Sequence, residues 1–162
     1  MDNKIKFGTS GWRGIIADDF TFSNVRKVSR GIRDYILQEN LKDKGIVIGY
    51  DTRFLSKEFA KEVAKIFAES DIKVLFIEEP APTPVISFTI LKYKTAGGVN
   101  ITASHNPYYY SGLKFSPSWG GPAEPEVTLK IEEFLNKESD KEIKKDFEDF
   151  VKEGKIQIIE PS

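Results

Sequence analysis

The stretch TASHNP, residues 102–107, places a serine beside the single histidine of the 162-residue chain. The hydroxyl of Ser104 can carry a covalently bound group, and an imidazole such as that of His105 suits proton transfer. Because adjacent residues of an extended loop point apart, we expect His105 to support the loop by hydrogen bonds. Asn106 and Pro107 are expected to shape the loop, since proline disfavours helix at the residue before it.

Two arginines lie in short polar or glycine-containing stretches, FGTSGWRG (residues 7–14) and GYDTRF (residues 49–54). A guanidinium donates two parallel hydrogen bonds and therefore fits a phosphate well. Arg13 and Arg53 are accordingly candidate phosphate ligands. For Arg53, a salt bridge with Asp51 is an equally good interpretation.

The composition excludes several classes of function. The chain has 24 basic and 25 acidic residues, a net charge of −1 and no cysteine. Disulfides, thiolate nucleophiles and cysteine-ligated metals are excluded, and no basic footprint for nucleic acid is present. No signal-peptide pattern and no apolar run of membrane-spanning length is found, so we expect a cytoplasmic protein that does not bind membranes.

Short β-branched or apolar runs bounded by turn residues indicate strands. We expect an opening strand at Ile5–Phe7 and buried strands in GIVIGYD, KVLFIEE and AGGVNITAS, with a further short strand in GLKFS. The glycine- and proline-rich stretch SPSWGGPAEP is expected to be a loop.

Apolar residues at helical spacing follow several of these strands. We expect a first helix with Ser23 as its N-cap, a second helix after Ser56, and a third in which Thr83 caps the end before a proline. Two closing helices are predicted, one over residues 127–135 and one that opens with a capping box at 139–142 and ends at Gly154.

Strands that alternate with helices indicate parallel βαβ units. The sequence therefore predicts a three-layer α/β/α sandwich with a mostly parallel, mixed sheet. Ligands of such sheets bind beyond the carboxyl ends of the strands. FGTSGWRG, GYDTRF and TASHNP each follow a predicted strand, so we expect them to meet at one edge.

FGTSGWRG, GYDTR, PTP and GGVNITASHNP, in this order and spacing, resemble the first domain of the α-D-phosphohexomutases, the phosphoglucomutase and phosphomannomutase family. TASHNP followed by Gly112-x-Lys114 is the most specific part of the match. One departure is Ser111, where the family usually has asparagine. The resemblance implies an isomerase that interconverts hexose 1-phosphate and hexose 6-phosphate through a phosphoserine and a sugar bisphosphate.

The resemblance also implies roles for individual residues. Ser104 would carry the phosphoryl group, and its phosphate would contact a magnesium ion. Lys114 would contact the transferring phosphate or move a proton, and Arg13, with Thr9 and Ser10, would lie beside the phosphoserine. The supporting residues are then His105, Asn106 and Arg53.

Family members have four domains, and only the first is recognisable here. We expect that domain at residues 1–154 and the start of a linker to a second domain at residues 155–162. The sequence contains no Asp-rich loop of the D-x-D-x-D type, so the other Mg²⁺ ligands are expected from a second domain. We expect a monomer that packs against downstream domains, binds a hexose phosphate and is inactive without those domains.

Two other functions agree with parts of the pattern. A non-catalytic α/β module could bind an anion or a partner at its glycine-rich edge. A serine hydrolase would use Ser104 with His105, although the chain lacks a G-x-S-x-G elbow and its histidine is the immediate neighbour of the serine.

Overall fold

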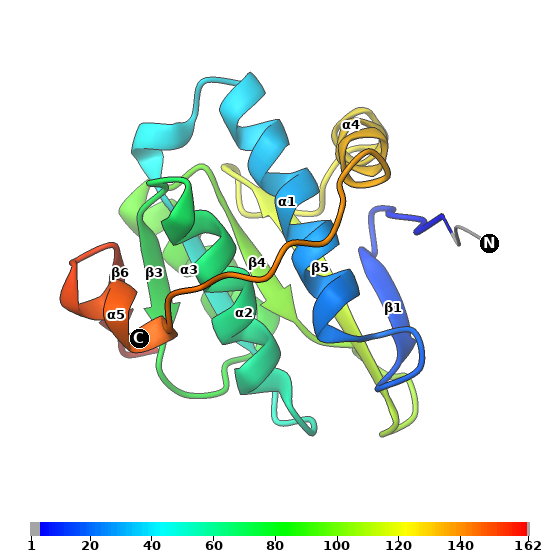
Figure 1. Cartoon of the computed structure of the whole chain (residues 1–162). Helices are drawn as coiled ribbons and strands as arrows, with labels where there is room; N and C mark the ends of the chain where they lie inside the picture. Colours follow the sequence, from blue (N-terminus) through cyan, green and yellow to red (C-terminus); the bar gives the residue numbers. More distant parts are fainter. Residues whose placement is uncertain (1–3, 162) are drawn as a thin grey trace.

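A mixed six-stranded sheet forms the centre of the computed structural model, which describes residues 4–161 (Figure 1). The strand order is β1-β5-β4-β2-β3-β6. The strands are β1 (Trp12–Ile15), β2 (Ile46–Tyr50), β3 (Val74–Ile77), β4 (Gly97–Ile101), β5 (Tyr110–Pro117) and β6 (Ile156–Ile159).

The central strands run parallel, and β5 reverses the direction at one side of the sheet. β2 pairs in parallel with β3 and β4, β3 pairs in parallel with β6, and β5 is antiparallel to both β4 and β1. Every residue of β2, β3 and β4 is buried, as expected for strands covered on both faces. The predicted mostly parallel sheet is confirmed.

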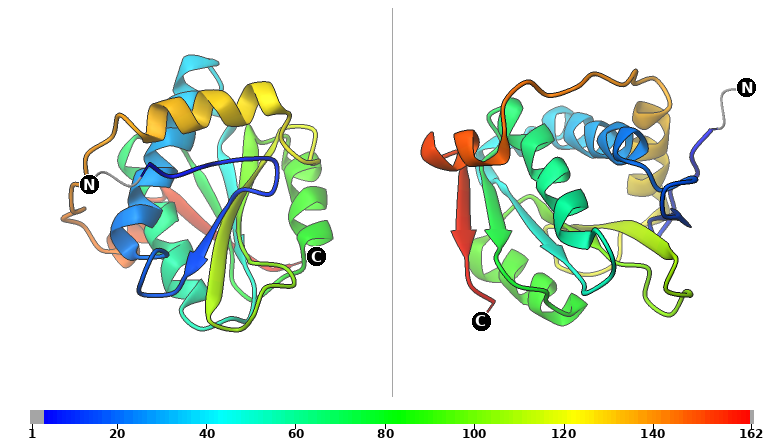
Figure 2. Two further views of the ribbon diagram at one scale, coloured as in Figure 1. Left: turned by 90° about the vertical axis from the view of Figure 1, so that its right-hand side faces the viewer. Right: turned by 60° about the horizontal axis from the view of Figure 1, so that its bottom comes forward.

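Helices cover the two faces of the sheet unequally (Figure 2). Within residues 4–161, one face carries four helices and the large core cluster, and the other carries one helix and a smaller cluster. The helices of the first face are α1 (Phe22–Gln38), α2 (Ser56–Glu69), α4 (Pro125–Leu135) and α5 (Phe147–Lys152), and the second face has α3 (Thr83–Tyr93). A short 3₁₀ helix occupies Lys42–Lys44. The three-layer architecture predicted from the sequence is confirmed.

The predicted opening strand at Ile5–Phe7 is wrong, because the first strand is β1. The backbone of Ile5 forms its hydrogen bonds with the side chain of Asn136. Its N–H donates to Asn136 Oδ1 at 3.2 Å, and its carbonyl accepts from Nδ2 at 3.1 Å. The side chains of Ile5 and Phe7 are nevertheless buried in the core. The apolar pattern therefore reflects the burial of these side chains and not pairing of the backbone with another strand.

Two predicted helix caps are also wrong. Thr21, and not Ser23, caps α1 by accepting a hydrogen bond from the backbone N–H of Asn24 at 3.1 Å. Thr83 is the first residue of α3, whose N-cap is Pro82. The Thr83 hydroxyl accepts a hydrogen bond from the sheet instead, donated by the side chain of Asn100.

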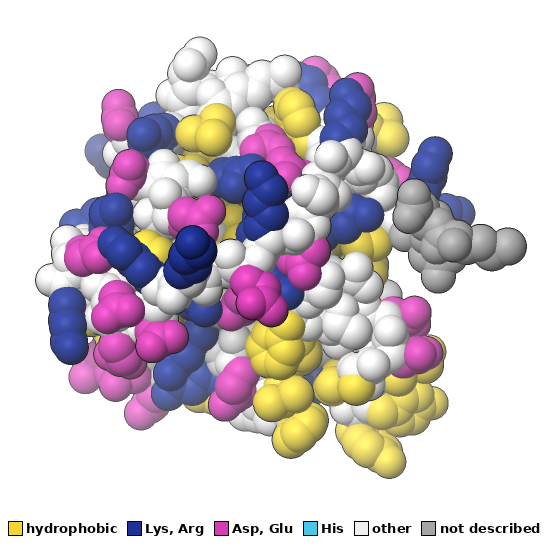
Figure 3. Space-filling model, in the orientation of Figure 1, with side chains coloured by type: hydrophobic (Ala, Val, Ile, Leu, Met, Phe, Trp, Pro, Cys, Tyr) yellow, Lys and Arg dark blue, Asp and Glu magenta, His cyan; other side chains and the backbone are white. Residues whose placement is uncertain are grey.

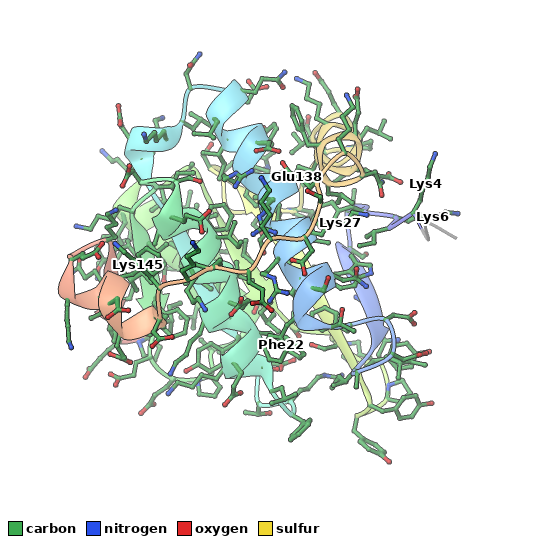
Figure 4. All side chains as sticks on the ribbon, in the orientation of Figure 1. Lys4, Lys6, Phe22, Lys27, Glu138 and Lys145 are labelled. Atoms are coloured by element: carbon green, nitrogen blue, oxygen red, sulfur yellow. The ribbon has the colours of Figure 1, made fainter. Side chains whose placement is uncertain are left out.

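The helix predicted to open at 139–142 does not form there, since α5 begins at Phe147 with a capping box between Asp146 and Asp149. Residues 138–146 instead cross α1 and α2 as an extended segment, here called the strap (Figure 1). Glu138 and Lys145 lie toward its two ends (Figure 4).

Arginines of α1 hold the strap. Arg26 donates from Nε to Asp140 Oδ1 at 2.7 Å and from Nη2 to Oδ2 at 2.8 Å. Arg30 donates to the carbonyl oxygen of Lys141. Farther along α1, Arg33 pairs with Glu138 at 3.2 Å. These contacts hold the strap to α1 through two carboxylates and one backbone carbonyl, which explains why the local capping pattern does not decide the structure.

The tail of the chain also differs from the prediction. Residues 155–162 were expected to begin a linker, but Ile156–Ile159 form β6 at the edge of the sheet, paired with β3. Gly154 has a φ of +76° and ends α5 as predicted. The domain therefore extends at least through Ile159.

Of the helices within residues 4–161, none is both long and apolar enough to cross a membrane.

The bond between the strap and α1 predicts a dependence of stability on pH. Hydrogen bonds from Arg26 lower the pKa of Asp140 to about 2. An aspartate with a lowered pKa in the folded state stabilises the fold above about pH 4, and this contribution is lost as the pH falls toward 2. Asp140→Asn should lower the free energy of unfolding by about 1 to 2 kcal/mol at pH 7, discounted for partial exposure, and the loss should shrink below pH 3.

Urea denaturation of both proteins between pH 7 and pH 2 measures this difference. Glu133→Gln is the matched control, because Glu133 forms an exposed pair with Lys137 at 3.3 Å and should contribute little. An equal loss for Asp140→Asn at pH 7 and pH 2 would contradict the assigned role.

Candidate functional site

The register of the sheet brings residues near the start of the chain to the carboxyl end of β4. Ile101, the last residue of β4, pairs with Leu113, which in turn pairs with Trp12, the first residue of β1. β1 therefore begins where β4 ends. Arg13 lies opposite Gly112, one residue beyond that level. The stretch FGTSGWRG therefore lies at the expected edge of the sheet. It leads into strand β1, however, and does not follow a strand as predicted.

Ser104 follows β4 in a loop with an unusual backbone conformation. Its φ is +53°, in the left-handed region, which costs a non-glycine residue about 1 kcal/mol or more. Two local hydrogen bonds hold this conformation: the N–H of Ser104 donates to Thr102 Oγ1 at 3.2 Å, and the N–H of Asn106 donates to the carbonyl of Ala103 at 3.1 Å. The result is a serine side chain exposed at the edge of the sheet.

Arg13 bridges two residues of this loop. Its Nη1 donates to Asn106 Oδ1 at 2.6 Å, and its Nη2 lies 3.4 Å from Ser104 Oγ. Gly112 makes room for this arginine, since a Cβ there would lie 3.0 Å from Arg13 Cγ and 2.5 Å from the carbonyl oxygen of Thr102. A cation is thus held next to the serine hydroxyl.

Arg53 organises the loop from its other side, through the backbone. Its two terminal nitrogens donate to four carbonyl oxygens at 2.6 to 3.0 Å. These carbonyls belong to Ser104, Asn106, Pro107 and Tyr110. The guanidinium is therefore committed to the loop and does not present a free fork to a phosphate.

Asp51 holds Arg53 in place. Asp51 Oδ2 lies 3.4 Å from Arg53 Nε, and Asp51 Oδ1 accepts from the Arg53 N–H at 3.0 Å and from Ser56 Oγ at 2.6 Å. The salt bridge proposed from the sequence is present. The spacing of Asp and Arg in GYDTR predicted this pair, whereas nothing in the sequence indicated the four carbonyl partners.

Lys114 lies on the same face of the sheet as Arg13. Arg13 is opposite Gly112, and Lys114 follows two residues along β5, a distance of about 7 Å. Its side chain is half-buried, and within the described residues its ammonium takes part in no ion pair or hydrogen bond. A second cation therefore lies on this face, two residues along β5 from the position opposite Arg13.

The remaining predicted residues are less constrained. Thr9 and Ser10 form the tip of a tight turn closed by hydrogen bonds between Gly8 and Gly11, and both are exposed. Among residues 4–161, neither side chain hydrogen-bonds to Ser104, and the expected hydrogen bonds of His105 are not observed.

Exposed aromatic residues surround this edge. Hydrophobic side chains gather at the end of the molecule where α2 and β5 begin (Figure 3). The exposed large side chains there include Phe22, Phe54, Tyr108 and Tyr109. Tyr108 and Tyr109 contact each other edge to face at 5.4 Å. An exposed aromatic rim beside a polar site suits burial against another surface.

The geometry favours binding of an anion at Ser104. Arg13 approaches the hydroxyl, whereas no hydrogen bond joins Ser104 to His105 in the part of the chain described. The nearby carboxylate of Asp51 is already neutralised by Arg53. The guanidinium of Arg13 beside the hydroxyl suits a phosphate, and the site lacks the serine–histidine contact that a hydrolase requires.

Comparison with known proteins gives consistent similarities. The family model of phosphoglucomutase/phosphomannomutase, alpha/beta/alpha domain I, matches residues 4–142. A phosphoglucomutase of Staphylococcus saprophyticus is 38% identical over 164 residues, covering 98% of this chain and 30% of that protein. A phosphoribomutase of Saccharomyces cerevisiae is 33% identical over 150 residues, covering 84% of this chain and 24% of that protein.

A solved structure shares the fold. The crystal structure of a candidate phosphomannomutase from Thermus thermophilus matches with a TM-score of 0.80 and 38% identity, over 86% of this chain and 31% of that chain. This chain therefore spans less than a third of the length of these relatives.

The commitment of Arg53 to four carbonyls predicts a large effect of its removal. Arg53→Met should lower the free energy of unfolding by about 2 to 3 kcal/mol, because several charge-assisted hydrogen bonds are lost and carbonyls are left unpaired. Amide hydrogen exchange of residues 103–110, followed by NMR, should become faster. Lys57→Met, an exposed change nearby in α2, is the matched control. Unchanged exchange in Arg53→Met would exclude this role.

Proposed function

Because the chain belongs to the phosphoglucomutase/phosphomannomutase family through its α/β/α domain I, we propose that it carries the phosphoryl-bearing serine of a hexose phosphate mutase. The whole enzyme would interconvert hexose 1-phosphate and hexose 6-phosphate. The observation that carries this proposal is the guanidinium of Arg13 beside Ser104 Oγ, in a loop that holds the serine exposed.

Ser104 acts as a reversible phosphoryl carrier. A hydroxyl of the sugar monophosphate attacks the phosphorus of phospho-Ser104, the Oγ–P bond breaks, and a sugar bisphosphate forms. After the bisphosphate has turned round, Ser104 Oγ attacks its other phosphoryl group and releases the isomeric monophosphate. The serine is phosphorylated again at the end, so no phosphate is consumed.

The surrounding residues hold the charge that this exchange requires. A phosphoserine carries a charge of about −1.5 to −2 at neutral pH. Arg13 and Lys114 bind the phosphate oxygens, and their fixed charges stabilise the transferring group. Arg53 positions the loop by donating hydrogen bonds to the carbonyl oxygens of the loop. The side chain of Asn106 accepts a hydrogen bond from Arg13 and thereby orients it. As an ammonium that binds the phosphate, Lys114 cannot also accept the proton of the attacking hydroxyl, so we expect another domain to supply that base.

A magnesium ion is expected from the family, but the residues described here do not form a site for it. In residues 4–161, no group of three or more His, Asp or Glu side chains is arranged to bind a metal. The carboxylate of Asp51, the residue that follows β2, is engaged by Arg53 and Ser56. The ligand that this chain can offer is the phosphate of phospho-Ser104, and the remaining ligands would come from another domain.

Other domains also have to recognise the sugar. Ser104 lies at an exposed edge, and the chain spans 30% of the length of the related phosphoglucomutase from S. saprophyticus. We expect downstream domains to cover this edge, bind the hexose and its second phosphate, and retain the bisphosphate while it reorients. A cytoplasmic monomer agrees with the sequence and is part of this proposal.

Arg13 and Lys114, which form no ion pair within residues 4–161, predict weak binding of inorganic phosphate to this chain. Titration with phosphate should shift the NMR amide signals of residues 102–106, with a Kd on the order of 1 mM that weakens as salt is added. Arg13→Met should weaken binding about fivefold or more, because a charge-assisted contact is lost. Lys137→Met, which removes one exposed positive charge elsewhere, should change it little. Shifts confined to another surface would contradict the assignment.

Because other domains are expected to bind the hexose and its second phosphate, we predict that this chain by itself has no mutase turnover. A chimera in which it replaces the matching region of the S. saprophyticus phosphoglucomutase should convert glucose 1-phosphate into glucose 6-phosphate. Ser104→Ala should lower that turnover by about 1,000-fold or more, since the carrier is lost. A coupled dehydrogenase assay measures all three proteins. Turnover by the chain alone, or by the Ser104→Ala chimera at the unsubstituted rate, would overturn the proposal.

A further inference from the structure

Asn100 is a polar residue in the middle of a strand that is otherwise apolar and buried. It lies in β4, only 5% of its surface is exposed, and its neighbours along the strand are Val99 and Ile101. An amide buried at such a position lowers stability unless each of its polar atoms finds a partner. Its presence therefore requires a specific explanation.

The hydrogen bonds of Asn100 account for one end of the amide only. Nδ2 donates to Thr83 Oγ1 at 3.1 Å, which places the side chain on the α3 face of the sheet. Oδ1 is buried and has no hydrogen-bond partner among the described residues. A buried carbonyl without a partner costs about 1 to 3 kcal/mol, so an acceptor is left ready for a donor.

The sheet determines which donor can reach this oxygen. On the β2 side, Asn100 is opposite Gly49, where the space is filled by Ile86, since a Cβ on that glycine would lie 2.6 Å from Ile86 Cδ1. On the β5 side, its direct partner is Lys114. Side chains of such a pair lie on the same face with Cβ atoms about 5 Å apart. Lys114 is thus the cationic neighbour of the unpaired oxygen.

The ammonium group of Lys114 also lacks a partner within the described residues. It has three N–H donors, and none forms a hydrogen bond or ion pair within residues 4–161. A free lysine side chain loses up to about 2 kcal/mol of conformational entropy when a ligand immobilises it. A fixed acceptor beside the ammonium reduces that cost and directs the charge.

We propose that Asn100 is a positioning residue for Lys114. Its Oδ1 accepts one N–H of the Lys114 ammonium and leaves the other two for a phosphate at Ser104. Thr102, two residues farther along the same face, accepts the N–H of Ser104. Asn100 of β4 and Thr102, the residue that directly follows β4, thereby set the lysine and the serine. This inference rests on the proposed function, because it concerns the phosphate site described there.

Phosphate titration of the chain, followed by NMR amide shifts of residues 102–106, tests the proposal through a double-mutant cycle. Asn100→Leu preserves the approximate side-chain shape and removes the acceptor, and it should weaken phosphate binding about three- to tenfold. Lys114→Met should weaken it at least as much. In the Lys114→Met background, Asn100→Leu should have no further effect, because the residue acts through the lysine.

Two further variants separate positioning from a structural role. Thr83→Val removes the partner of Nδ2 and leaves Oδ1 in place, so it should change the phosphate Kd by less than about twofold. Asn100→Ala gives a second test of the cycle should Asn100→Leu unfold, and thermal denaturation of each variant monitors folding. An equal loss of affinity with and without Lys114, or a loss reproduced by Thr83→Val, would overturn the inference.

The same experiment distinguishes this inference from the proposed function. Absence of any phosphate response at residues 102–106 in the unsubstituted chain would overturn the phosphate site itself, and the inference with it. A response that is present and unchanged by Asn100→Leu would overturn the inference alone.

Discussion

The site depends on one guanidinium that is bound almost entirely by backbone. Arg53 collects four carbonyl oxygens of the loop after β4, and Asp51 holds the arginine in turn. Carbonyls that turn toward one cation fix the path of the chain between them. Ser104 can therefore remain exposed in a left-handed conformation that an unsupported serine would rarely adopt. Arg53 binds the backbone carbonyl of Ser104, whereas Arg13 contacts the Ser104 hydroxyl.

The unequal covering of the sheet explains why the cations gather where they do. Four helices bury one face, whereas α3 alone packs on the other. Arg13 and Lys114 lie on the α3 face at the side formed by β1 and β5, where two strands extend past the end of β4. Charged side chains can lie there with their apolar stems against the sheet and their ends in solvent. A closed three-layer core and an accessible charged edge are therefore compatible in one small domain.

Most of the fold could be predicted because burial leaves a periodic pattern. The runs GIVIGY and KVLFIEE contain strands buried on both faces, and the apolar spacing of α1, α2 and α4 follows the helical repeat. The errors occurred where a distant side chain replaced a local bond. The side chain of Asn136 forms the hydrogen bonds of the Ile5 backbone in place of a neighbouring strand, and arginines of α1 hold residues 138–146 extended. Local propensity contributes only tenths of a kcal/mol per residue, which such contacts exceed.

By itself, the sequence determined the fold class and the family and supplied the candidate reactive residues, because these follow from residue type, spacing and periodic burial. The tertiary structure alone decided how those residues are used. It committed Arg53 to the backbone and left Arg13 beside Ser104, although the two arginines were equally suited to phosphate by type. It also set Asn100 opposite Lys114. Such pairings join strands and loops far apart in the chain, and strand register, which no single segment encodes, determines which side chains meet.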